Sequence, residues 1–226
     1  MNDVAVIVPW GSGCPNREAA WRWVSGRYGL NHPTWKVLKA SSSTDRWCKA
    51  AAVNPAVAKS TADVIVQADA DVWTDGLGEA IQQIEAGAPW AVPHNLVHRL
   101  SEVGTQAVLD GADWSAQPLA QRPYAGLIGG GIVVARREVF EAVPLDMRFK
   151  GWGQEDEVHG VALCAHYGAP WRGNADLVHL WHPPQERMSR RKGSAASWAL
   201  RQRYWACRND KAGVERLLEE ARCAIA

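Results

Sequence analysis

ADVIVQADADVW, at residues 62–73, contains the strongest local signal in the sequence. Its apolar half is typical of a buried strand, and it leads directly into Asp69-Ala70-Asp71. In extended backbone, residues two apart project to the same side, so both carboxylates are expected to face one cleft at the carboxyl end of the strand. Carboxylate oxygens bind hard divalent cations, and such a cation can also hold a diphosphate. The alternative for this motif alone is an ordinary acidic turn.

Short apolar runs alternate with helical patterns on both sides of this stretch. The expected strands are residues 4–10, 35–38, 62–67, 90–93 and 132–135. The expected helices are residues 16–29, 45–60, 76–87 and 136–143. This alternation predicts an α/β sheet with crossover helices, in which ligands bind beyond the carboxyl ends of the strands. Residues 108–127 are rich in turn formers and are predicted to be a long surface loop.

A second acidic motif lies in FKGWGQEDEVHG at residues 149–160. Glu155, Asp156 and Glu157 precede apolar residues at helical spacing, so these carboxylates are expected to open a helix. Acidic residues in a first turn commonly serve the free amides and the helix dipole, which is the structural alternative. The same dipole keeps a carboxylate ionised, as a general base must be.

Two histidines follow an apolar pair in LVHLWHPP at residues 177–184. Neutral imidazole is a common metal ligand, so His179 and His182 are candidates to complete the coordination begun by the aspartates. A structural or surface role is the alternative for the pair alone.

These motifs, in this order, resemble the inverting GT-A glycosyltransferases. The likeness covers about residues 4–184, and its most specific part is GGGIVVARREVF (129–140) followed by GWGQED (151–156). It is closest to β-galactosyltransferase-like and chondroitin-polymerase-like enzymes, which carry a DxD and a later WGxED. The resemblance implies a Rossmann-like mixed α/β sheet flanked by helices. It also implies inverting transfer of a sugar from a nucleotide diphosphate, expected to be UDP, to an acceptor hydroxyl, with Mn²⁺ as the metal and Mg²⁺ as the alternative.

The resemblance also assigns roles to single residues. It makes Asp156 the catalytic base, with Glu155 as the next candidate, and Glu155 and Glu157 contact the acceptor. The implied metal ligands are Asp71 and His179, with His182 in reserve. The residues implied to bind the nucleotide or the sugars are Asp69, Arg17, Asp45, Trp152, Glu157, Gly130 and Gly131.

Composition bounds what else the chain can be. Its 226 residues are 47% hydrophobic, enough for one core, and a formal net charge of +1 gives no global attraction for nucleic acid or membrane surfaces. Five cysteines without a CxxC spacing favour neither a disulfide framework nor a zinc site. This cysteine usage fits a reducing cytoplasm, and no apolar stretch is long enough for a membrane span. Animal members of the family that the chain resembles carry a Golgi anchor, so the resemblance implies a cytoplasmic enzyme of bacterial or viral origin.

The expected organisation is a catalytic domain at residues 1–185, followed at 186–226 by a basic flexible loop and helices that pack on the same domain. A dimer contact is the alternative for these helices. The loop MSRRKGS (188–194) is expected to be either a lid over the diphosphate or a solvated segment.

The sequence leaves the acceptor open among glycan, protein, lipid and modified DNA, and it leaves the oligomeric state open. A nucleotidyltransferase and a non-catalytic carbohydrate-binding module of the same fold are the competing functions. A nucleotidyltransferase would normally carry a basic glycine-rich loop after the first strand, and PWGSGCPNR (9–17) is a poor version of one.

Overall fold

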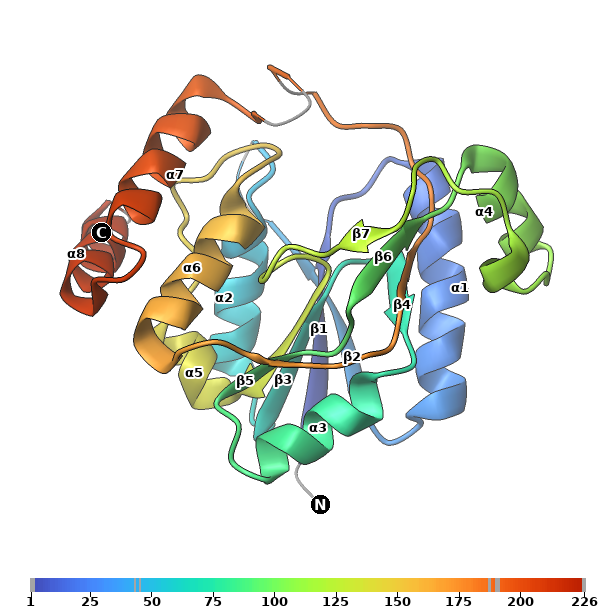
Figure 1. The fold of residues 1–226 in the computed structure, drawn as a ribbon, viewed down its shortest axis with the longest axis horizontal. Coiled ribbons are helices and arrows are strands. Elements are labelled where there is room, and N and C mark those ends of the chain that lie inside the picture. Colours follow the sequence, from blue (N-terminus) through green and yellow to red (C-terminus); the bar gives the residue numbers. More distant parts are fainter. Residues whose placement is uncertain (1–2, 43, 45, 187, 190–191, 225–226) are drawn as a thin grey trace.

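The computed structural model of the chain describes residues 3–42, 44, 46–186, 188–189 and 192–224. Its centre is a six-stranded sheet with the order β2-β1-β3-β8-β5-β9 (Figure 1). These strands are β1 (Val4–Trp10), β2 (Lys36–Ser41), β3 (Val64–Ala68), β5 (Trp90–Val92), β8 (Ile132–Arg136) and β9 (Trp171–Arg172). Every strand expected from the sequence is present within a few residues of its predicted place.

The sheet is mixed. Strand β1 is parallel to both β2 and β3, whereas β8 is antiparallel to both of its neighbours, β3 and β5. Because β8 runs in the opposite direction, the glycines that precede it meet the carboxyl end of β3. This brings the Gly129–Gly131 segment to the edge of the sheet where the Asp69-Ala70-Asp71 motif begins.

A second sheet of four strands has the order β4-β10-β6-β7. Its strands are β4 (Val72–Thr74), β6 (Leu96–Arg99), β7 (Tyr124–Ala125) and β10 (Leu177–His179). Strand β10 is antiparallel to β4, with His179 opposite Val72. This pairing carries the histidine motif to the residue that follows Asp71, although the two motifs are more than 100 residues apart in the sequence.

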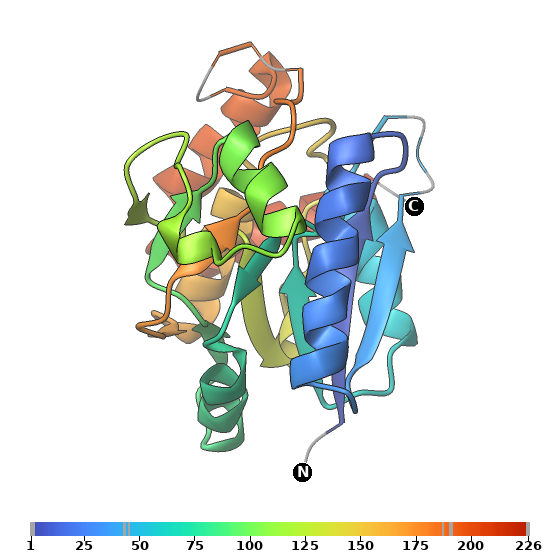
Figure 2. The same ribbon diagram turned by 90° about the vertical axis from the view of Figure 1, so that its right-hand side faces the viewer.

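Helices cover both faces of the central sheet. On one face lie α2 (Lys49–Lys59), α5 (Arg137–Ala142) and α6 (Glu155–Tyr167), and on the other lie α1 (Pro15–Asn31) and α3 (Leu77–Glu85). Helix α4 (Glu102–Leu109) lies beside α1 (Figure 2). The C-terminal helices α7 (Ala195–Ala206) and α8 (Lys211–Cys223) lie against α6 (Figure 1).

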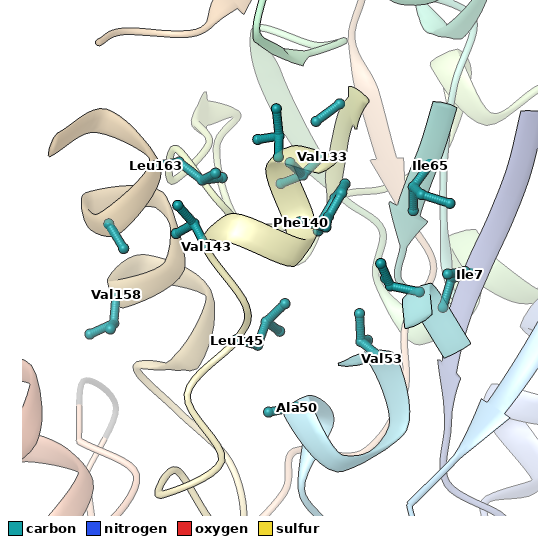
Figure 3. Packing of buried hydrophobic residues seen from close by; sticks show 14 of the residues in the cluster. Ile7, Ala50, Val53, Ile65, Val133, Phe140, Val143, Leu145, Val158 and Leu163 are labelled. Carbon is teal, nitrogen blue, oxygen red and sulfur yellow. The ribbon is translucent and has the colours of Figure 1, made fainter. Parts of the chain in front are cut away.

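Successive side chains along each strand point to opposite faces of the sheet, and this divides the core into two clusters. Ile7, Ile65 and Val133 point toward α2, α5 and α6, where they pack with Val53, Phe140 and Leu163 (Figure 3). The residues next to them on the strands, including Val6, Val66 and Val134, point toward the other layer. Each fully buried side chain of this size contributes about 1.5–3 kcal/mol, so the two-sided burial fixes the register of the strands.

Residues 108–127 are not a continuous loop, which corrects the expectation from composition. They contain the end of α4, a 3₁₀ turn at Trp114–Ala116 and strand β7. Within this segment the carboxylate of Asp113 accepts a hydrogen bond from the amide of Ser115 and so caps the 3₁₀ turn.

In the C-terminal helices, Val214, Leu217 and Leu218 are buried in the same cluster as α6, together with Leu200 and Tyr204 of α7. Among the described residues, no helix is both long enough and apolar enough to cross a membrane.

Candidate functional site

The Asp69-Ala70-Asp71 motif forms the turn by which the chain leaves the central sheet and enters the second one. The amide of Asp69 donates a hydrogen bond of 2.9 Å to the carbonyl of Gly131, and the amide of Leu180 donates one of 2.8 Å to the carbonyl of Asp71. The sequence suggested an extended strand end at this motif, but the structure has a turn there. The two carboxylates, joined through this turn, have different neighbours.

Asp71 lies with both histidines of the third motif. One ligand atom each from Asp71, His179 and His182 fall within 4.8 Å of one another. The Nε2 atom of His182 is 3.2 Å from Oδ2 of Asp71, and the Nε2 atom of His179 is 3.9 Å from Oδ1. A divalent cation at about 2.1 Å from each ligand needs donors about 3–4 Å apart, so small side-chain adjustments suffice for these three to hold one.

The electrostatics of the cluster also suit a cation. Burial lowers the pKa of His179 to about 4, which keeps its imidazole neutral and able to bind metal. Burial by itself would raise the pKa of Asp71, but the neighbouring His179, His182 and Arg17 lower it, so the carboxylate is ionised. One carboxylate and two imidazoles form a donor set suited to divalent first-row transition metals, a group that includes Mn²⁺.

Arg17, in the first turns of α1, reaches the same cluster. Its Nε atom is 3.4 Å from Oδ2 of Asp71, and its Nη2 atom is 3.3 Å from Nδ1 of His182. The arginine side chain is 19% exposed and lies beside both the acid and the imidazole. The positive charge beside Asp71 is therefore supplied by the protein itself.

Asp69 belongs to a second cluster, which centres on Lys49. The Nζ atom of Lys49 lies 2.7 Å from Oδ1 of Asp69 and 2.6 Å from Oδ1 of Asp156. The lysine side chain is only 5% exposed, whereas the two carboxylates are 30% and 25% exposed. Lys49 thus links the first acidic motif to the second through one buried ammonium group.

The charges in this second cluster strongly affect one another. Burial by itself would lower the pKa of Lys49, but Asp156 and Asp69 raise it well above its ordinary value, so the lysine is charged. Burial raises the pKa of Asp156, and Lys49 opposes this shift. The pKa of Glu155 is raised to about 7 by burial and by the charge of Asp156, and its Oε2 atom is buried without a hydrogen-bond partner among the described residues.

The start of α6 is held in place by close backbone packing. Gly129 lies so near the carbonyl oxygen of Asp156 and the amide of Gly160 that a Cβ at this position would overlap with both. Gly131 has a φ of 74°, which favours glycine, and its carbonyl accepts the amide of Asp69. The glycine segment therefore spaces the two acidic motifs relative to each other.

The C-terminal region also holds the start of α6. Gln154, immediately before the helix, has a φ of 73°, and its side-chain oxygen accepts a hydrogen bond of 3.1 Å from the amide of Gly193. The carboxylate of Glu157 receives two hydrogen bonds from Arg201 of α7, at 2.7 and 2.6 Å. The two residues on either side of the Glu155–Asp156 pair are thus tied to the segment that leads into α7 and to α7 itself.

The structure brings most of the sequence-predicted residues into these two linked clusters. Arg17, Asp71, His179 and His182 form one, and Asp69, Glu155 and Asp156 lie in the other. Trp152 lies in the turn before α6, its carbonyl packed against Gly193, and Gly130 lies beside Gly131. Asp45 and the loop residues Arg190 and Arg191 lie outside the described residues, so their expected roles stay predictions.

Lys49 and Arg201 were not identified from the sequence. A signal for Lys49 is present, because it opens the otherwise apolar helix KAAAVNPAVAK, where a positive charge opposes the helix dipole. A residue in that unfavourable position needs partners from elsewhere in the fold. Arg201 carries no such signal, since one arginine among several on α7 looks like ordinary surface charge.

Comparison of the sequence with protein-family models and with curated proteins gives no match. Among solved structures, the chain is similar to glucosyl-3-phosphoglycerate synthase from Mycobacterium tuberculosis in complex with Mn²⁺, UDP and glucosyl-3-phosphoglycerate. The TM-score is 0.54 and the identity 12%, over 92% of this chain and 80% of the synthase. It is also similar to GalNAc-T7 with UDP, GalNAc and Mn²⁺, with a TM-score of 0.52 and 13% identity. This alignment covers 98% of the present chain and 55% of GalNAc-T7.

A Drosophila β-1,4-galactosyltransferase 7 complex with manganese, UDP-Gal and xylobiose gives a TM-score of 0.45 at 17% identity, over 76% of this chain. The chain spans 65% of that galactosyltransferase and about half of GalNAc-T7. The TM-scores above 0.5 show that the synthase and GalNAc-T7 share their overall fold with this protein. The chain therefore has the GT-A fold of the nucleotide-diphospho-sugar transferases.

Proposed function

We propose that this protein is a metal-dependent, inverting glycosyltransferase that moves a sugar from a UDP-sugar to an acceptor hydroxyl. The observation that carries the proposal is the pair of linked clusters. Asp71 forms a candidate cation-binding set with His179 and His182. It is two residues along the chain from Asp69, which shares Lys49 with Asp156. Leaving-group stabilisation and general-base catalysis need these two kinds of group within one site.

Asp71, His179 and His182 would hold the divalent ion, with Mn²⁺ preferred over Mg²⁺ because two of the three donors are imidazoles. When bound, this ion supplies Lewis-acid stabilisation of the charge that develops on the departing diphosphate. The structures of the synthase and of GalNAc-T7, both with TM-scores above 0.5, contain UDP and Mn²⁺, which supports UDP as the first nucleotide to test.

Asp156 would act as the base. Its carboxylate accepts the proton of the acceptor hydroxyl as that oxygen forms a bond to the anomeric carbon, and the bond from this carbon to the diphosphate oxygen breaks with its electron pair. Lys49 favours the ionised form of Asp156 and fixes the direction of one carboxylate oxygen through the 2.6 Å hydrogen bond. The other oxygen is then left for the acceptor.

The same fold and the same acidic residues would also serve a protein that binds a nucleotide sugar without transferring it. The acceptor can be a glycan, a protein, a lipid or modified DNA. Under this proposal it enters the site from the side of α6. The acceptor hydroxyl would then meet the turn that contains Trp152 and the first turn of α6, which contains Glu155.

The test is a panel of nucleotide sugars, measured for binding by calorimetry and for slow donor hydrolysis, each with Mn²⁺ and with a chelator. Donor hydrolysis needs no acceptor. We expect metal-dependent binding of one or a few UDP-sugars, followed by release of UDP. Asp71→Ala, His179→Ala and His182→Ala are expected to abolish the metal dependence, with His98→Ala as a matched histidine control on β6, outside the cluster.

Equal donor affinity with and without chelator would contradict the metal assignment. Tight, metal-dependent donor binding without hydrolysis or transfer to any of a set of glycan, peptide, lipid and DNA acceptors would favour a binding module. Release of inorganic diphosphate from a nucleoside triphosphate in the presence of a sugar phosphate would instead identify a nucleotidyltransferase.

A further inference from the structure

We propose that Arg17 occupies the cation position beside Asp71 and His182 in the metal-free protein, and that metal entry moves it onto the donor diphosphate. This inference rests on the proposed function, because it needs both a divalent metal and a nucleoside diphosphate. It assigns Arg17 the role of an internal counter-ion that links the binding of the two ligands.

The contacts of Arg17 coincide with those that a metal needs. Its Nε atom approaches Oδ2 of Asp71 at 3.4 Å, and its Nη2 atom lies 3.3 and 3.5 Å from the two ring nitrogens of His182. Oδ2 of Asp71 is also the oxygen that lies 3.2 Å from Nε2 of His182. The guanidinium therefore contacts two of the three members of the candidate metal cluster.

The burial of Asp71 explains why a cation belongs there. Its side chain is only 6% exposed, and its Oδ2 atom faces both Arg17 and His182. A buried carboxylate needs a positive partner, and guanidinium, which has five donors and no acceptor, is such a group.

Arg17 and a metal ion cannot keep these contacts together. A divalent ion would use the same Oδ2 oxygen and the same imidazole lone pair at about 2.1 Å, where a guanidinium a few ångströms away is strongly repelled. The arginine must then move. Its Cα lies at the start of α1, next to the carboxyl end of β1, where free amides and the helix dipole already favour an anion. A diphosphate that bridges the metal and this helix start would be within reach of the displaced guanidinium.

The experiment compares Arg17→Met with Arg22→Met, an exposed arginine on the same helix that serves as the matched control. Binding of Mn²⁺ alone and binding of UDP at saturating Mn²⁺ are both measured by calorimetry. We expect Arg17→Met to bind Mn²⁺ about tenfold more tightly, because the competing cation is gone. It should bind UDP about tenfold more weakly, because one charged contact to phosphate is lost. Arg22→Met should match the wild type in both measurements.

Arg17→Lys distinguishes charge from shape. Lysine keeps the charge but cannot make the forked contact to Asp71 and His182, so we expect Mn²⁺ affinity between those of the wild type and Arg17→Met. A thermal melt confirms that each variant folds. Unchanged or weaker Mn²⁺ binding by Arg17→Met, with Asp71→Ala still abolishing it, would overturn this inference and leave the metal site standing. Failure of the wild type to bind Mn²⁺ even with UDP would overturn the proposed function as well.

Discussion

Lys49 and Asp156 form a 2.6 Å ion pair between the first residue of α2 and the second residue of α6. The same ammonium group lies 2.7 Å from Asp69, so one buried cation serves two carboxylates from two separate motifs. Removing one member of a buried ion pair leaves an uncompensated charge, which costs about 3–5 kcal/mol of stability. The triad therefore contributes to both the fold and the electrostatics of the site.

The first prediction concerns Lys49→Met. The variant should lose a few kcal/mol of unfolding free energy, because Asp69 and Asp156 then face each other without a counter-ion. Its Asp156 should also need a higher pH to ionise, since Lys49 lowers the pKa of that carboxyl. Chemical denaturation measures the first effect, and the pH dependence of donor hydrolysis measures the second. Lys49→Arg should retain most of both properties.

Lys59→Met is the control for this prediction, because Lys59 is the exposed lysine at the other end of α2. It should leave stability and the pH profile unchanged. A Lys49→Met protein with wild-type stability and an unshifted acidic limb would show that the triad has no such role.

The second prediction concerns Asp156→Asn. Asparagine preserves the shape of the side chain but cannot take up the acceptor proton. Transfer should therefore fall by about two to four orders of magnitude while donor affinity persists. Transfer kinetics and donor calorimetry on the same preparation measure both quantities. If the folded variant turns over like the wild type, Asp156 is not the base and Glu155 becomes the candidate.

The third prediction separates two roles for Glu157. The resemblance implies that Glu157 contacts the acceptor, whereas both of its carboxylate oxygens accept hydrogen bonds from Arg201, one from Nε and one from Nη2. If the pair positions α6, Glu157→Gln and Arg201→Met should each lower stability, with a coupling energy of about 1 kcal/mol in a double-mutant cycle. Thermal unfolding of the four proteins measures this coupling.

Under the positioning role, both single variants should lower the rate of transfer to a similar degree. If Glu157→Gln instead raises the acceptor KM and Arg201→Met leaves it unchanged, Glu157 acts on the acceptor directly.

The fourth prediction concerns acid stability. Burial lowers the pKa of His159 to about 4, and its Nε2–H donates to the carbonyl of Val143 at 3.1 Å. In the unfolded chain this histidine has a pKa of about 6.5. Between about pH 6.5 and pH 4 the unfolded state therefore binds a proton that the folded state does not, and stability falls as the pH falls.

This single group can remove about 3 kcal/mol across that window. His159→Gln keeps a donor for Val143 but does not titrate, so its unfolding free energy should decline less steeply from pH 7 to pH 4. Denaturation at a series of pH values provides the slopes. Parallel slopes for the two proteins would rule out His159 as a source of acid sensitivity.

Local patterns in the sequence were sufficient to predict helices and strands of the central sheet and its layers, and to predict several site residues. Strand β3 follows from an unbroken apolar run, and α6 follows from apolar residues at helical spacing behind three acids. Burial on both faces of a strand, or along one side of a helix, depends on residues within a few positions of each other, so it can be recognised without knowing the fold. The placement of Asp69 directly after β3 and of Glu155 and Asp156 at a helix start could therefore be predicted.

The partners of these residues were decided by the tertiary structure. His182 meets Asp71 because β10 pairs antiparallel with β4, and the sequence contains no local preference for that pairing. The turn at Asp69–Asp71, which directs the two carboxylates to different partners, depends on hydrogen bonds to Gly131 and Leu180 from distant segments. Lys49 meets Asp156 because α2 and α6 cover the same face of the sheet, 107 residues apart in the chain. Such contacts arise from packing and long-range backbone pairing. They stabilise the protein only after folding has brought these distant segments together.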